Sequence, residues 1–301
     1  MSMLQISAAR FIKSRHLLSY LALLIGTLGL GFSGIFVKWA NVGGAVSGFY
    51  RVAIAAAVMA IPFGFEIRRR APIARRHVLL AILGGLFFAG DLATWNTSVL
   101  LTSVASATLF GNTSPLWVSL GALILFKEKL GRSFWIGLAL TLLGTLVIVG
   151  ENFSLSSSVG VGNLLAIAAG MFYAAFFLCT QRAREGLSSL TAWWISAAAS
   201  AAALWVAAFA LGQPLTGYST FSYWSLIGVA LVTQVGAYLA INYALGHLPA
   251  SIVSPTLLGQ PVLSALLAVP LLGQPITAFQ IIGGLIVLAG IWMVHRQGRG
   301  R

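Results

Sequence analysis

The chain has 301 residues, of which 59% are hydrophobic and only 8% are charged, and its formal net charge is +13. A soluble domain averages about 25% charged residues, so this composition excludes a soluble fold and predicts a polytopic membrane protein. The apolar runs continue for about 20 residues, which favours transmembrane helices over a β-barrel. The basic residues are scattered in short loops between these runs, so we do not expect nucleic acid as a partner.

The N-terminal residues 1–16 contain Arg10, Lys13 and Arg15 but no acidic residue. Because no small-residue cleavage site follows, we expect an uncleaved first span rather than a signal peptide. A mitochondrial presequence stays open as an alternative on composition alone. Further along, apolar segments recur at roughly 18–39, 45–65, 78–100, 104–126, 134–150, 161–181, 190–211, 223–245, 250–272 and 276–295. They predict an all-α integral membrane protein with ten transmembrane helices.

Basic residues alternate between the two ends of these segments. The loops 68–77, 127–132 and 182–184 are rich in Lys and Arg, as are both chain ends, whereas the loops 151–162 and 212–222 have none. Lys and Arg beside transmembrane helices mark the cytoplasmic side. We therefore expect both termini on the cytoplasmic side, with the chain crossing the membrane several times.

The two halves of the chain resemble each other at a constant offset of 146 residues, which aligns Gly90 with Gly236, Asn96 with Asn242 and Pro115 with Pro261. An odd number of spans in each half turns the second half upside down, as in secondary transporters built from inverted repeats. The expected units are a tail (1–17), a first five-helix repeat (18–150), an outer loop (151–160), a second repeat (161–295) and a tail (296–301).

Each half also carries a related segment after a proline-containing fourth span: LFKEKLGRSFWIGLALTLLG (125–144) and LLGQPITAFQIIGGLIVLAG (271–290). With these paired segments the chain resembles the EamA-type transporters of the drug/metabolite transporter superfamily. The second copy departs from the first by carrying Gln274 where the first has Glu128. The resemblance implies a multi-pass protein of the bacterial cytoplasmic (inner) membrane that exports amino acids or other small metabolites from the cytoplasm. YddG-like members move aromatic amino acids.

Two charges lie inside predicted spans at similar depth, Asp91 in the third and Arg51 in the second. Ionisable residues within a membrane are rare and usually paired, so we expect these two side chains to lie close enough to pair. One reading is a purely architectural ion pair. The other is a functional role in transport, as a binding charge for the substrate or as a protonation site for coupling. Both readings stay open.

Pro115 and Pro261 interrupt the fourth and ninth spans at matching positions of the repeat. Interrupted helices at corresponding positions of two halves point to a transport site, although a kink used only for packing gives the same pattern. Aromatic rings and amides nearby are candidates to line a cavity for an amino-acid-sized solute, although each alone also suits packing or lipid contact. The candidate substrate-binding residues are Trp95, Asn96, Phe110, Asn112, Phe172, Tyr173, Phe176, Tyr238 and Asn242.

These features predict a transporter of small metabolites that works by alternating access, and the resemblance implies export of amino acids, including aromatic ones. We expect no catalytic residue, cofactor or metal site, contacts with membrane lipid, and a monomer or weak dimer. One alternative is a proton-coupled antiporter in which Asp91 carries the proton. A polar-lipid flippase or a membrane enzyme is a further alternative.

Overall fold

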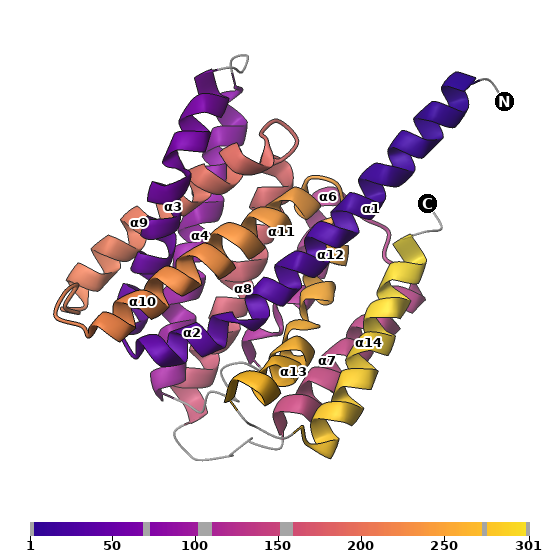
Figure 1. The fold of residues 1–301 in the computed structure, drawn as a ribbon. Helices are drawn as coiled ribbons and strands as arrows, with labels where there is room; N and C mark the ends of the chain where they lie inside the picture. Colours follow the sequence, from indigo (N-terminus) through magenta and orange to yellow (C-terminus); the bar gives the residue numbers. More distant parts are fainter. Residues whose placement is uncertain (1–2, 69–72, 102–109, 151–158, 273–275, 299–301) are drawn as a thin grey trace.

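The computed structural model describes residues 3–68, 73–101, 110–150, 159–272 and 276–298, and these residues form helices and short connections without a strand. The expected all-α class is confirmed (Figure 1). The predicted outer loop 151–160 and C-terminal tail 296–301 lie largely outside the described residues. The N-terminal tail is helical from Met3 and continues into the first span.

The helices follow one another as α1 (Met3–Gly31), α2 (Ser33–Ala40), α3 (Gly44–Arg68), α4 (Arg75–Leu101), α6 (Ser114–Phe126), α7 (Arg132–Gly150), α8 (Val159–Ala183), α9 (Ser189–Ala210), α10 (Thr220–Gly228), the π-helix η1 (Val229–Ala237), α11 (Tyr238–Leu245), α12 (Ala250–Leu257), α13 (Gln260–Leu272) and α14 (Ala278–Gly298).

Seven helical stretches in the described residues are long and apolar enough to cross a membrane. They are Leu17–Val37, Gly44–Arg68, Arg75–Ser98, Gly160–Ala183, Ser189–Ala210, Thr220–Leu245 and Ala278–Arg296. Two shorter apolar helices cover Ser114–Phe126 and Arg132–Ile148. Large apolar side chains on the outside remain exposed, for example Phe209 at 80% and Ile124 at 75%, as expected where the solvent is lipid rather than water.

Helices α3, α4, α8 and α9 pack together, with α4 in contact with both α8 and α9 (Figure 1). The Ser200 hydroxyl of α9 donates to the Gly85 carbonyl of α4 over 2.7 Å. Such small polar residues let transmembrane helices approach closely and bond across the contact. The largest buried cluster draws side chains from these helices and from α1, η1, α11 and α12.

Helices α7 and α14 lie side by side and run antiparallel (Figure 1). Gly137 of α7 faces Gly290 of α14, and Gly144 faces Gly283, so closely that a Cβ on any of the four would come within 3 Å of the facing backbone. The contact is reciprocal, because the offset of 146 residues relates Gly137 to Gly283 and Gly144 to Gly290.

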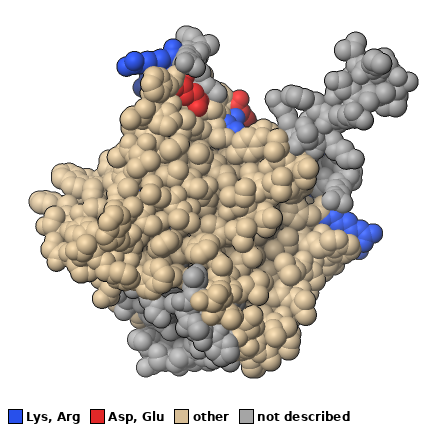
Figure 2. Space-filling model, in the orientation of Figure 1, with Lys and Arg blue, Asp and Glu red and all other residues tan. Residues whose placement is uncertain are grey.

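Charged side chains gather at the end of the bundle where α3 and α14 finish, which we call the termini end. On the face shown in Figure 2, the Lys, Arg, Asp and Glu side chains that the structure describes lie toward this end, above a broad uncharged surface. The described residues 68, 75, 76, 127, 129, 132, 182, 184 and 296 supply Lys or Arg there.

Candidate functional site

Arg51 lies in the middle of the bundle, on α3, with only 7% of its surface exposed. Its Nε donates to Oε1 of Gln234 on η1 over 2.9 Å, and one terminal nitrogen donates to Oγ of Ser33 over 3.3 Å. The guanidinium also lies 5.3 Å from the ring centre of Tyr238. These contacts give a buried cation the partners it needs and join the first half of the chain to the second.

Asp91 lies on α4 within electrostatic range of Arg51, and both charges also act on Tyr173 and Tyr238. The direct pair that the sequence predicts is not formed: among the described residues, no ion pair within 4.0 Å joins Arg51 to Asp91. The guanidinium bonds instead to the uncharged side chains of Gln234 and Ser33. Asp91 itself is half-buried.

Aromatic side chains from α4, α8 and α11 meet beside these charges. Phe88 lies 4.9 Å from Phe176 and 5.0 Å from Tyr238 between ring centres. The Tyr238 hydroxyl donates to the Tyr173 hydroxyl over 3.2 Å. Phe172 packs against the α4 backbone, where a Cβ on Gly90 would be 3.2 Å from its ring. The structure thus brings together five of the predicted lining and charged residues, Arg51, Asp91, Tyr173, Phe176 and Tyr238; we call them the central cluster, with Phe88.

A second group of predicted lining residues lies at the start of α6. A Cβ on Gly111 would be 3.2 Å from Cδ1 of Trp95, so the turn before α6 packs on the half-buried Trp95 ring. Phe110 accepts a bond from the Thr113 hydroxyl through its carbonyl over 2.6 Å. The side-chain Nδ2 of Asn112 is buried without a hydrogen-bond partner in the described structure.

The two asparagines that the repeat aligns bond to backbone carbonyls. Nδ2 of Asn96 donates to the Gly44 carbonyl over 2.7 Å, which ties α4 to the start of α3. Nδ2 of Asn242 donates to the Tyr238 carbonyl over 3.2 Å, and the residue is only 2% exposed. Asn96 therefore joins two helices, whereas Asn242 bonds within α11, one turn from Tyr238 of the central cluster. Oδ1 of Asn242 is buried without a hydrogen-bond partner in the described structure.

Both repeat-related prolines stand at the second position of a helix, Pro115 in α6 and Pro261 in α13. A turn at 112–113 precedes α6, and a turn at 258–259 separates α12 from α13. Because the first N–H groups of a helix have no intrahelical partner, proline costs no hydrogen bond there. The prolines therefore begin new helical segments. At each break, the first backbone N–H groups of the new helix have no hydrogen-bond partner within that helix.

Two glutamates at the termini end join the halves, a role that the sequence does not reveal. Glu66 of α3 accepts bonds from the Ser188 hydroxyl and, over 2.9 Å, from the Thr191 hydroxyl, at the N-terminus of α9. Oε2 of Glu128 accepts from the Ser251 hydroxyl of α12 over 2.5 Å. We call these two contacts the glutamate ties. Carboxylates are stabilised near helix N-termini by the helix dipole.

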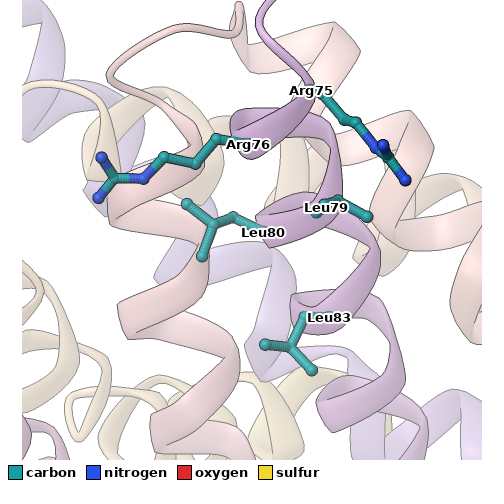
Figure 3. A pocket seen from close by; sticks show the side chains of 5 residues that line it. All are labelled: Arg75, Arg76, Leu79, Leu80 and Leu83. Atoms are coloured by element: carbon teal, nitrogen blue, oxygen red, sulfur yellow. The ribbon is translucent and has the colours of Figure 1, made fainter.

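A small open hollow lies at the start of α4, away from the central cluster (Figure 3). Arg75 and Arg76 point to opposite sides of the helix there, above Leu79, Leu80 and Leu83. Basic heads over apolar side chains suit the boundary between lipid headgroups and hydrocarbon.

Comparison with known proteins agrees with this architecture. Residues 17–150 and 160–296 each match the EamA-like transporter family. The chain therefore belongs to the EamA-like transporter family, as its resemblance predicts, and it is a multi-pass membrane protein.

Individual relatives are more distant. The chain is 30% identical over 204 residues to the aromatic amino acid exporter YddG of Escherichia coli, covering 62% of this chain and 68% of the relative. It is 22% identical over 276 residues to the uncharacterized transporter YdfC of Bacillus subtilis, covering 91% and 89%. A solved crystal structure matches with a TM-score of 0.78 at 18% identity, covering 95% of this chain and 98% of the other, a likeness of fold alone.

Proposed function

We propose that this protein exports small metabolites, with amino acids including aromatic ones as its substrates, across the bacterial cytoplasmic membrane by alternating access. The observation that carries the proposal is the contact of Arg51 with Gln234, which joins the two halves beside Asp91 and a group of aromatic rings. Substrate sites of secondary transporters lie between repeats near the bilayer midplane. The similarity to an exporter of aromatic amino acids supports the same substrate class.

The proposed architecture has ten spans in two inverted five-helix repeats, 18–150 and 161–295, with both termini in the cytoplasm. It is supported by the antiparallel α7 and α14, whose facing glycines are related by the repeat offset. Repeats related by an axis along the membrane normal would make these helices parallel. The Lys and Arg side chains at the termini end support the orientation.

The proposed motion rocks one half against the other around the central cluster. The glutamate ties join the halves at the termini end, so a passage toward the cytoplasm requires them to break. The breaks before α6 and α13 place helix N-termini within the bundle, where partial positive charge favours an anionic group of a substrate.

A thermal-shift screen of the purified protein against the common amino acids tests the substrate class. We expect aromatic amino acids to raise the melting temperature, because a ligand that binds only the folded state stabilises it. A screen in which no amino acid changes the melting temperature, while a polar lipid does, favours a flippase instead.

Proton-coupled antiport is the second candidate, since Asp91 is an acid within a span and takes part in no ion pair among the described residues. We favour weakly coupled or facilitated flux, because Asp91 is the one acid among the described residues that lies far from a helix end. Efflux from liposomes that is driven by an imposed pH gradient and abolished by Asp91→Asn would reverse this preference.

A further inference from the structure

Asp91 differs from every other acidic residue that the structure describes. Glu66 and Glu128 accept bonds from hydroxyls, and Glu185 pairs with Arg182 over 2.5 Å. The Asp91 carboxylate has no described hydrogen bond or ion pair, although the residue lies within the span Arg75–Ser98. Only its backbone carbonyl accepts a bond, from the Thr94 hydroxyl over 3.3 Å. A carboxylate within a membrane that no partner contacts is costly, and a cation or a proton in contact with it lowers that cost.

Arg51 is placed to act on a different part of the same ligand. Its described partners are Gln234 on Nε, Ser33 on one terminal nitrogen and the Tyr238 hydroxyl, whereas a guanidinium has five N–H donors in a planar fork. The remaining donors are available to a carboxylate, which guanidinium binds well. Since no direct ion pair joins Arg51 to Asp91, the two opposite charges stand near each other without neutralising each other by contact.

The rings beside the charges supply the third element. Phe88, Phe176 and Tyr238 lie with their centres 4.9 to 6.2 Å apart. Aromatic faces attract cations and provide apolar contact for a ligand side chain. A carboxylate, a guanidinium with spare donors and a group of rings together match the ammonium, the carboxylate and the side chain of one α-amino acid zwitterion.

We propose that Asp91 binds the ammonium group and Arg51 the carboxylate of the transported α-amino acid, with its side chain against the rings of Phe88, Phe176 and Tyr238. The inference rests on the proposed transport function and assigns a substrate group to each charge. Binding both groups of a zwitterion at once excludes amines and acids that carry only one of them.

A crossed ligand and variant experiment tests this assignment. The probes are phenylalanine, 2-phenylethylamine (which lacks the carboxylate) and 3-phenylpropionate (which lacks the ammonium), and the affinity of each is measured on the purified full-length protein by equilibrium binding. We expect Asp91→Asn to weaken phenylalanine and phenylethylamine by at least roughly tenfold and to spare phenylpropionate. We expect Arg51→Gln to weaken phenylalanine and phenylpropionate to the same extent and to spare phenylethylamine.

Controls separate a binding role from misfolding. Asp91→Glu keeps the carboxylate and should retain amine binding, whereas Glu185→Gln removes an exposed carboxylate and should change no affinity. A variant that weakens all three probes equally, or none, overturns the assignment. If phenylalanine exchanges across the membrane without the crossed pattern, only the assignment fails. If no probe binds and no amino acid exchanges, the proposed function fails with it.

Discussion

At the scale of single residues, Gln234 is the residue on which the central cluster depends. Its side chain accepts from Arg51, and its backbone carbonyl accepts from Nε1 of Trp193 over 3.1 Å. Gln234 is only 2% exposed and Arg51 only 7%, so bulk water cannot replace the Gln234 side-chain oxygen as an acceptor for the guanidinium. A buried guanidinium that loses an acceptor bears the cost of its desolvation.

We predict that Gln234→Leu lowers the free energy of unfolding by about 1.5–3 kcal/mol, the range for a hydrogen bond to a charged group. Gln234→Glu keeps an acceptor for Arg51 and should stay at least as stable as the wild type. Both variants are compared by thermal unfolding in detergent. Equal melting of Gln234→Leu and the wild type would mean that the contact contributes nothing.

The sequence predicts part of this cluster for a physical reason. Arg51 and Asp91 stand out because a charge inside an apolar run is costly, and the tyrosines and phenylalanines stand out as polar or aromatic neighbours. Gln234 does not stand out in the sequence in this way, because an uncharged amide within a span does not by itself indicate a functional site. Asn96 and Asn242 are aligned by the repeat, but the bond from Asn96 to the Gly44 carbonyl depends on helix packing that no local pattern reveals.

At the scale of elements, the helix breaks are predictable and the π-helix is not. Pro115 and Pro261 mark where α6 and α13 begin, because proline is favoured in a first helical turn. The π-helix Val229–Ala237 interrupts an apolar segment that contains no proline, so no helix-breaking residue in the sequence marks it. Such π segments are frequent at functional sites, and this one carries Gln234.

The antiparallel contact of α7 with α14 can be tested by adding a single Cβ atom to one of its glycines. A Cβ on Gly144 would lie 2.6 Å from the Val287 nitrogen and 2.7 Å from the Gly283 oxygen, so Gly144→Ala must push the helices apart. We expect destabilisation of about 1–3 kcal/mol, as for other overpacked contacts. The matched control is Gly64→Ala in α3, where a Cβ would meet nothing within 4 Å. If chemical unfolding shows that Gly64→Ala is less stable than Gly144→Ala, the result contradicts this packing.

The glutamate ties give a prediction about local opening. Glu128→Gln weakens the charge-assisted bond from the Ser251 hydroxyl and the favourable charge at the N-terminus of α12. We expect faster amide hydrogen exchange in α12 (Ala250–Leu257), measured by mass spectrometry. Glu185→Gln, which changes only an exposed pair with Arg182, should leave this exchange unchanged. Unchanged exchange in Glu128→Gln would show that the tie does not hold this end closed.

At the scale of the whole molecule, the apolar runs predict the all-α class and the bounds of several long helices, because lipid requires long apolar helices. The ends of α3, α4, α8 and α9 fall within a few residues of the predicted segments. The contacts between the halves are not predictable in this way. Glu66 and Glu128 look like solvated loop residues until folding brings them to α9 and α12.

The proposed orientation is tested by labelling single cysteines in a variant without Cys179. A cysteine at Ser219, before α10, should react with a membrane-impermeant reagent added outside intact cells. A cysteine at Arg132, where α7 begins at the termini end, should react only after the cells are opened. The reverse pattern would invert the proposed topology, and labelling of both sites from outside would break the proposed alternation.

The central claim is that the two halves enclose one site through which amino acids cross the membrane, and counterflow in proteoliposomes tests it most directly. Vesicles that contain the purified protein are loaded with unlabelled phenylalanine and diluted into a trace of radiolabelled phenylalanine. We predict transient accumulation of label, reduced in Asp91→Asn and unchanged in Glu185→Gln. No accumulation above protein-free vesicles, with phenylalanine or any other common amino acid, would contradict the account.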